Sequence, residues 1–169
     1  MSEQTADPVA ALRQPAHRVS RRAIVWWTVR ALIGWLVVLA PATVAVLVVP
    51  QRPPGAVAAL VVLVLLAATH TAVMPRWRYH VHRWEATDDA VYTQAGWLNQ
   101  EWRVAPMSRI QTVDTERGPL QQLFGLATVT VTTASAAGAL RIEGLEVRLA
   151  GELVEQLTAT TQATPGDAT

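Results

Sequence analysis

The chain has 169 residues and a formal net charge of +1, and 51% of its residues are hydrophobic while only 16% are charged. It contains no cysteine, which excludes disulfides, thiolate metal sites and cysteine nucleophiles. The mean hydropathy is only slightly positive, at +0.22. The chain therefore combines a membrane segment with a small polar domain, and it is too polar to be a helix bundle embedded entirely in lipid.

The N-terminal segment, residues 1–22, is polar, contains two prolines and shows no periodic apolar face. These features predict a disordered cytoplasmic arm. Two apolar runs follow, 31–49 and 55–74, and neither contains Asp, Glu, Lys or Arg. A helix needs roughly 20 apolar residues to cross about 30 Å of hydrocarbon. We therefore predict a transmembrane helical hairpin over 23–75, with spans at about 26–49 and 55–74.

The basic residues on either side of this hairpin predict its orientation. Four arginines precede the first span and three follow the second, whereas the connecting loop has Arg52 alone. Basic residues near span ends stay in the cytoplasm, so both termini are expected there, in a multi-pass protein of the bacterial plasma membrane. A cleaved signal peptide is a poorer explanation of the first run, because a second span follows at once. Trp26 and Trp27 fall where an interfacial aromatic belt is expected.

After the hairpin, residues 76–160 are expected to form one cytoplasmic domain. Apolar and polar residues alternate from Trp77 to Trp84, which predicts a first strand. Asp88 and Asp89 predict a turn. Further strands are predicted at 90–93, 101–104, 109–116, 126–133 and 139–143, with a helical turn at 119–124, a turn at 136–138 and an amphipathic helix over about 146–160. This order predicts an α+β fold, a bent antiparallel sheet or partly open barrel capped by the C-terminal helix. Residues 161–169 are expected to be a disordered tail.

Part of this pattern resembles a known family. The residues that carry the likeness are Arg109, Ile110 and Gln111, then Leu123, Phe124, Gly125 and Leu126, followed by the alternating Thr and Val residues of 127–133. With the two preceding spans, they resemble the YdbS-like bacterial membrane proteins with a pleckstrin-homology (PH)-like domain. The resemblance implies a PH-like barrel at the cytoplasmic membrane, and a larger membrane protein with related domains as partner.

Candidate binding residues lie directly after the second span. Arg76, Arg78 and Arg83, with Trp77, are the possible lipid-facing residues, since juxtamembrane cations attract anionic leaflets. His80 and His82 would share one strand face, but two imidazoles are only half of a metal site, so no metal site is predicted. The turn Asp88–Asp89 is acidic where eukaryotic lipid-binding PH domains carry basic residues, which argues against phosphoinositide binding there.

No nucleophile motif or phosphate-binding glycine loop occurs in the sequence, so we expect a non-enzymatic protein without a cofactor and without nucleic-acid binding. The leading hypothesis is a membrane-anchored module for protein association, as a homo-oligomer or with a larger membrane protein. An exposed tryptophan, or the strand 126–133 or another strand left at a sheet edge, would supply the surface. The alternatives are an anionic-lipid sensor and an accessory subunit of a transport or secretion complex.

Overall fold

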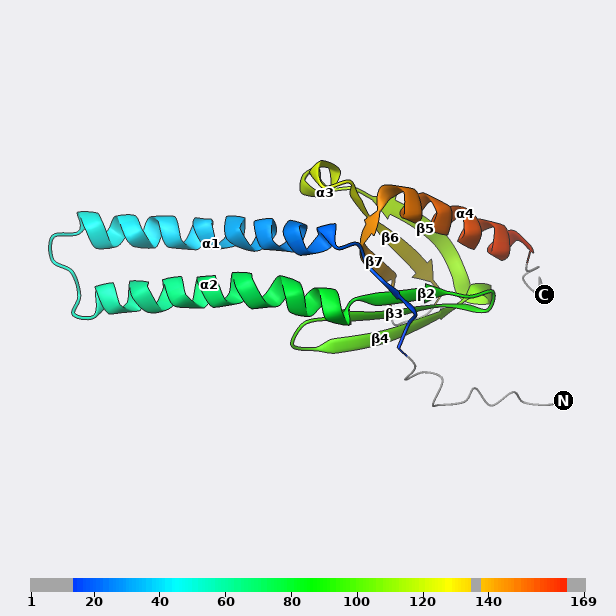
Figure 1. The fold of residues 1–169 in the computed structure, drawn as a ribbon, viewed down its shortest axis with the longest axis horizontal. Coiled ribbons are helices and arrows are strands. Elements are labelled where there is room, and N and C mark those ends of the chain that lie inside the picture. Colours follow the sequence, from blue (N-terminus) through cyan, green and yellow to red (C-terminus); the bar gives the residue numbers. More distant parts are fainter. Residues whose placement is uncertain (1–13, 135–137, 164–169) are drawn as a thin grey trace.

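The computed structural model describes residues 14–134 and 138–163. Two long helices, α1 (Arg22–Val48) and α2 (Ala56–Val81), lie side by side and project from one end of a smaller domain (Figure 1). Both helices are long and apolar enough to cross a membrane. The helical hairpin is therefore confirmed, and its helices are separated at the proline-containing segment 49–55. Helix α1 continues through Pro41.

Helix α2 is longer than predicted. It continues through Pro75 to Val81, so the strand predicted from Trp77 is wrong over its first five residues, and β2 comprises only Arg83–Ala86. Trp77 and Val81 are four residues apart, a spacing that places them on one helix face as readily as on one strand face. Each further helical residue adds a backbone hydrogen bond to the existing helix, which favours its continuation.

The domain contains two antiparallel sheets. The first has the order β1–β2–β3–β4 and the second the order β5–β6–β7. Their remaining strands are β1 (His17–Arg18), β3 (Ala90–Gly96), β4 (Gln100–Pro106), β5 (Ile110–Glu116), β6 (Leu126–Thr133) and β7 (Leu140–Glu146). A 3₁₀ turn, Met107–Arg109, joins the sheets. The antiparallel α+β class is confirmed, but the sheets do not close into a barrel.

Two helices complete the domain. Helix α3 (Pro119–Leu123) is the predicted helical turn, and α4 (Val147–Ala163) packs on the second sheet. Leu153 and Leu157 of α4 are buried in the core, as their helical spacing indicated. Helix α4 extends to residue 163, so the prediction of disorder is wrong for residues 161–163. Residues 164–169 and most of the predicted turn at 136–138 lie outside the described residues.

The N-terminal arm is partly structured. His17 of β1 pairs with Trp84 of β2, and Arg18 pairs with Arg83. The following Val19 is buried. The prediction of disorder is therefore wrong for residues 17–22, while 1–13 lie outside the described residues. The partner strand lies more than 60 residues further along the chain, so the local composition of the arm contained no sign of the pairing.

The first turns of α1 belong to the core of the domain. Trp26 and Trp27 are buried there, with Trp27 fully inaccessible to solvent, so their prediction as interfacial belt residues is wrong. Gly144 of β7 makes this contact possible: a Cβ at this position would lie 2.8 Å from the Cβ of Ala23, and its φ of +80° also favours glycine. Helix α1 is thus packed directly on the second sheet.

Candidate functional site

Arg78 joins both transmembrane helices to the second sheet. Its guanidinium carbon lies 4.7 Å from the centre of the Trp27 ring. Its Nη2 donates a hydrogen bond to Glu143 Oε2 on β7 at 3.2 Å, and both side chains are about three-quarters buried. The structure therefore places Arg78, a predicted lipid-facing residue, inside the junction between α1, α2 and β7.

His82 lies beside this arginine, immediately after α2. Its Nδ1 donates to the backbone oxygen of Arg78 at 2.9 Å, and its Nε2 lies 3.4 Å from Arg78 Nη2, where an unprotonated nitrogen accepts. Burial of the ring, together with the Arg78 charge, lowers the pKa of His82 to about 4. His80 is on the exposed side of α2, so the two imidazoles do not share a strand face as predicted.

A cavity of about 600 Å³ lies where α2 meets the first sheet. Arg76, Trp77 and Arg83 line it, so three of the four predicted lipid-facing residues are brought together. Arg76 Nη1 donates to the backbone oxygen of Ala72 at 2.6 Å, and Arg83 Nη1 donates to that of Pro15 at 3.4 Å. Each guanidinium has five N–H donors in total, so both retain capacity to bind an anion.

Gln94 is a further residue of this cavity that the sequence did not reveal. Its side chain is almost completely buried, and its Oε1 has no hydrogen-bond partner among the described residues. A buried acceptor without a donor is costly. Because Ala72 and Val73 of the apolar run also line the cavity, it opens at the level where the predicted span ends.

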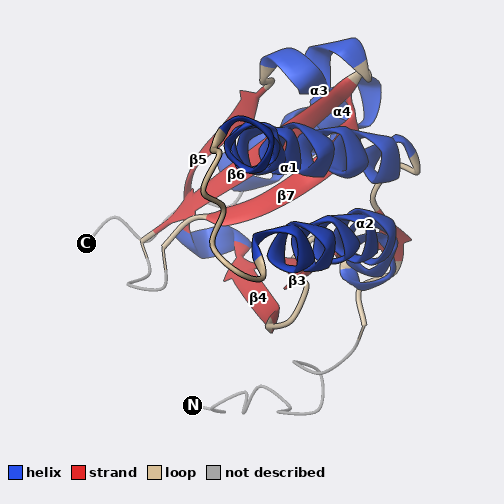
Figure 2. Cartoon of the chain, turned by 90° about the vertical axis from the view of Figure 1, so that its left-hand side faces the viewer, coloured by secondary structure: helices blue, strands red, loops and turns tan. Residues whose placement is uncertain are grey.

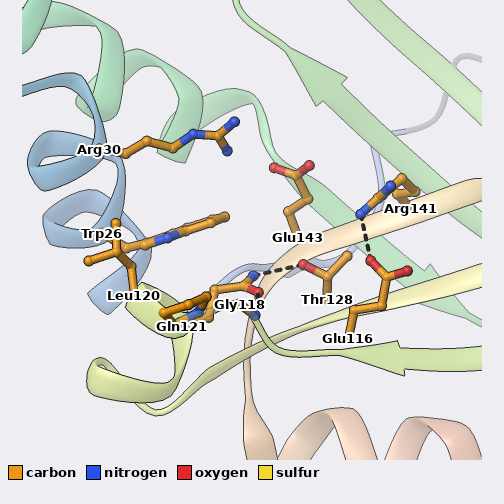
Figure 3. Close-up of a pocket in the computed structure, with 10 residues that line it drawn as sticks. Trp26, Arg30, Glu116, Gly118, Leu120, Gln121, Thr128, Arg141 and Glu143 are labelled. Atoms are coloured by element: carbon orange, nitrogen blue, oxygen red, sulfur yellow. Dashed lines mark hydrogen bonds and ion pairs between the residues drawn. The ribbon is translucent and has the colours of Figure 1, made fainter. Parts of the chain in front are cut away.

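A second cavity, of about 520 Å³, lies on the other side of the helix pair, between α1, α3 and the second sheet (Figure 3). Arg30 and Trp26 line it from α1. On the opposite wall Gln121 Nε2 donates to Thr128 Oγ1 at 2.8 Å, which holds α3 against β6. Helix α3 is therefore fixed beside the first turns of α1.

The β4 strand is an edge of the first sheet. Along it, Arg103 points inward and donates to the backbone oxygen of Ala139 at 2.6 Å. Trp102 and Val104 alternate with it and remain 43% and 45% exposed. The strand 126–133, which the sequence analysis considered as an edge, is instead the central strand β6, paired on both sides.

The residues that carried the family resemblance have structural roles. The backbone oxygen of Arg109 accepts a hydrogen bond from the Ala134 N–H at 3.1 Å. Gly125, with φ of +65°, ends α3, and Leu126 is fully buried at the start of β6. Ile110 and Phe124 pack on the core, Gln111 lies at a register shift between β5 and β6, and Leu123 is exposed. The signature thus marks the β5–α3–β6 corner.

Comparison with known proteins agrees with this architecture. The family model described as Bacterial PH domain matches residues 29–161. The chain belongs to the bacterial PH domain family. It is also 29% identical, over 157 residues, to the transmembrane protein YdbS of Bacillus subtilis (strain 168), an alignment that covers 91% of this chain and 98% of that protein. No solved structure matches the chain.

Within this bacterial PH domain, the acidic turn Asp88–Asp89 is confirmed between β2 and β3. Strand β2 begins next to α2 and runs away from it, so the turn lies at the end of the sheet remote from the transmembrane helices (Figure 1). The cavity that contains Arg76 and Arg83 is at the opposite end. The β2–β3 turn is therefore remote from the transmembrane helices, whereas the cavity lies beside α2.

Proposed function

We propose that the protein is a membrane-tethered PH-like module whose β4 strand binds another PH-like domain at the cytoplasmic face of the bacterial plasma membrane. That domain belongs to a second copy of the chain or to a larger membrane protein with related domains. The observation that supports this proposal is an edge strand of seven residues on which Trp102 and Val104 are exposed side by side.

An edge strand with exposed apolar residues can pair with another chain. A strand added beside β4 would pair with its outer backbone edge and cover the Trp102 side chain, and a buried aromatic residue contributes strongly to an interface. The membrane confines both partners to two dimensions, so their effective concentration is raised. A contact along β4 that would be weak between soluble proteins is then sufficient to keep the two partners associated.

The absence of cysteine from the sequence allows a direct test. A short bis-maleimide should crosslink Val104→Cys, in the full-length protein in its native membrane, to a cysteine of the partner. In a second copy of the chain that cysteine is the same substitution, and in another membrane protein it is a native or an introduced cysteine. The product should be a dimer of the chain or an adduct with a PH-like membrane protein, identified by mass. Trp102→Glu in the same background should reduce its yield.

The control is Arg148→Cys on α4, where the native side chain is 83% exposed. This position reports random collisions in the membrane. If Val104→Cys gives no more crosslinked product than Arg148→Cys, or if Trp102→Glu leaves the yield unchanged, association through β4 is refuted.

A second function is favoured by the cavity next to α2. Arg76 and Arg83 offer cationic donors for the phosphate of an anionic lipid headgroup. Full-length protein in nanodiscs that contain phosphatidylglycerol and phosphatidylcholine should then retain the anionic lipid in native mass spectrometry. Arg83→Gln should reduce this retention, whereas Arg148→Gln should not. Equal retention by all three proteins would exclude the site.

A further inference from the structure

The turn between β3 and β4, residues 97–99, is held against the transmembrane helices. The ring centres of Trp97 and His70 are 5.1 Å apart. His70 Nδ1 accepts a hydrogen bond from Trp35 Nε1 at 3.0 Å, and the Trp97 backbone oxygen accepts one from Trp77 Nε1 at 3.1 Å. These contacts connect the turn to α2 directly and to α1 through His70.

The turn itself is tight. Gly96 has φ of +123°, and a Cβ there would clash with the backbone oxygen of Asn99. Only glycine tolerates both conditions without strain. The strand pairing of Gly96 with Gln100 closes the turn. The position of the turn next to α2 is therefore fixed by the pairing of β3 with β4.

The Trp97 ring contacts α2 deeper than the charged residues that precede and follow the apolar runs. His70 is six residues before Arg76, which corresponds to about 9 Å along a helix. Trp35 is five residues after Arg30, or about 7.5 Å. His70, which contacts the Trp97 ring, and Trp35, which bonds His70, thus belong to the apolar parts of α2 and α1, on the lipid side of Arg76 and Arg30, while Trp77 binds the Trp97 backbone one residue beyond Arg76.

Leu98, at the tip of this turn, is 82% exposed in the structure. Covering a leucine side chain fully is worth about 1.5–3 kcal/mol, so its exposure to water at this position would be unfavourable. We propose that the β3–β4 turn inserts Leu98 into the bilayer beside α2, as a membrane contact additional to the two spans. The occupant of this surface is lipid, because the Trp97 ring beside it packs on His70 within the apolar run, and Val73, three residues after His70, is itself exposed.

This contact would fix the domain in one orientation against the bilayer. Without it, the domain is attached only by the ends of α1 and α2. With it, the β3–β4 turn, on the side of α2 away from α1, is held at the membrane as well (Figures 1 and 2). The cavity lined by Arg76 and Arg83 then faces the headgroups, whatever binds at β4.

The test places a fluorophore on the turn. Leu98→Cys, labelled with an environment-sensitive NBD group in the full-length protein, is reconstituted into phosphatidylcholine–phosphatidylglycerol liposomes. The control is Asp88→Cys in the exposed β2–β3 turn, at the end of the first sheet remote from the transmembrane helices. The label at position 98 should lose emission with nitroxide-bearing acyl chains and not with aqueous iodide, and the label at position 88 should behave oppositely.

Two results would overturn the proposal. Quenching of the label at 98 by iodide to the same extent as at 88 would place the turn in water. Resistance of the label at 98 to both quenchers would mean that protein, such as a second copy, covers the tip. Neither result depends on whether β4 captures a partner, because the readout at position 98 is the depth of the label.

Discussion

His82 should make the stability of the fold depend on pH. The imidazole has a pKa of 6.5 in the unfolded chain and about 4 in the fold, where burial and the neighbouring Arg78 disfavour its charged form. A base whose pKa is lower in the fold binds fewer protons there than in the unfolded state. Its contribution to stability is therefore complete above pH 6.5 and is lost progressively as the pH falls toward 4.

The size of the effect follows from these two values. Between pH 7.5 and pH 5 the unfolded imidazole becomes almost fully protonated while His82 stays neutral, which costs about 2 kcal/mol of unfolding free energy. For a domain of roughly 100 residues this corresponds to a fall of about 8–16 °C in Tm. Other charged residues line a cavity of about 330 Å³ beside His82: Arg78, Glu101, Arg103, Arg141 and Glu143.

The assay must isolate His82 from these groups. Tm of the full-length protein in detergent is followed by tryptophan fluorescence at pH 7.5 and pH 5. His82→Asn keeps a donor for the Arg78 backbone oxygen but cannot be protonated, so its fall in Tm should be smaller than that of the wild type by the amount above. His80→Asn, at an exposed position on α2, should retain the wild-type difference. The reasoning is refuted if His82→Asn shows the same fall as the wild type.

Three further predictions concern single contacts. Gly144→Ala should destabilise the protein by about 2–4 kcal/mol in urea denaturation, since the new methyl both strains the backbone and displaces α1. An unchanged denaturation midpoint would contradict the close contact between Gly144 and Ala23. Gln121→Ala should cost about 1–3 kcal/mol in the same assay, because its side chain also accepts from the Gly118 N–H at 3.0 Å; a loss below 0.5 kcal/mol would show that these bonds are dispensable. Arg148→Ala, which removes an exposed pair with Glu152, should change stability by less than about 0.5 kcal/mol, and a larger change would mean that α4 makes contacts beyond those described.

The parts of the fold that follow from local pattern were predictable. The transmembrane helices were evident from hydropathy, and β6 was evident from the alternation of Thr and Val over residues 128–132. The end of α2 was not, because its apolar positions Trp77 and Val81 suit both a helix and a strand. Strand β1 was hidden because two residues form it, and their partners are remote in sequence.

The candidate site was predictable in part. Arg76, Trp77 and Arg83 do line one cavity, as their clustering after the span suggested. Arg78 does not line this cavity. It follows Trp77 by one residue in α2, so its side chain leaves the helix on another side and points toward Glu143. Gln94 carried no signal of its own, since an amide in an alternating strand is normally solvent-exposed. The exposure of Trp102 required knowledge of which strand forms the edge.

The position of β1 has a consequence for biogenesis. Strands β1 and β2 are neighbours in one sheet, yet both transmembrane helices lie between them in the chain. The domain is thus discontinuous, and the helical hairpin is an insertion into it. A fragment that starts after α2 lacks Val19, Trp26 and Trp27 from its core. The β1–β2 pairing therefore forms only when both ends of the helical hairpin lie on the same side of the membrane.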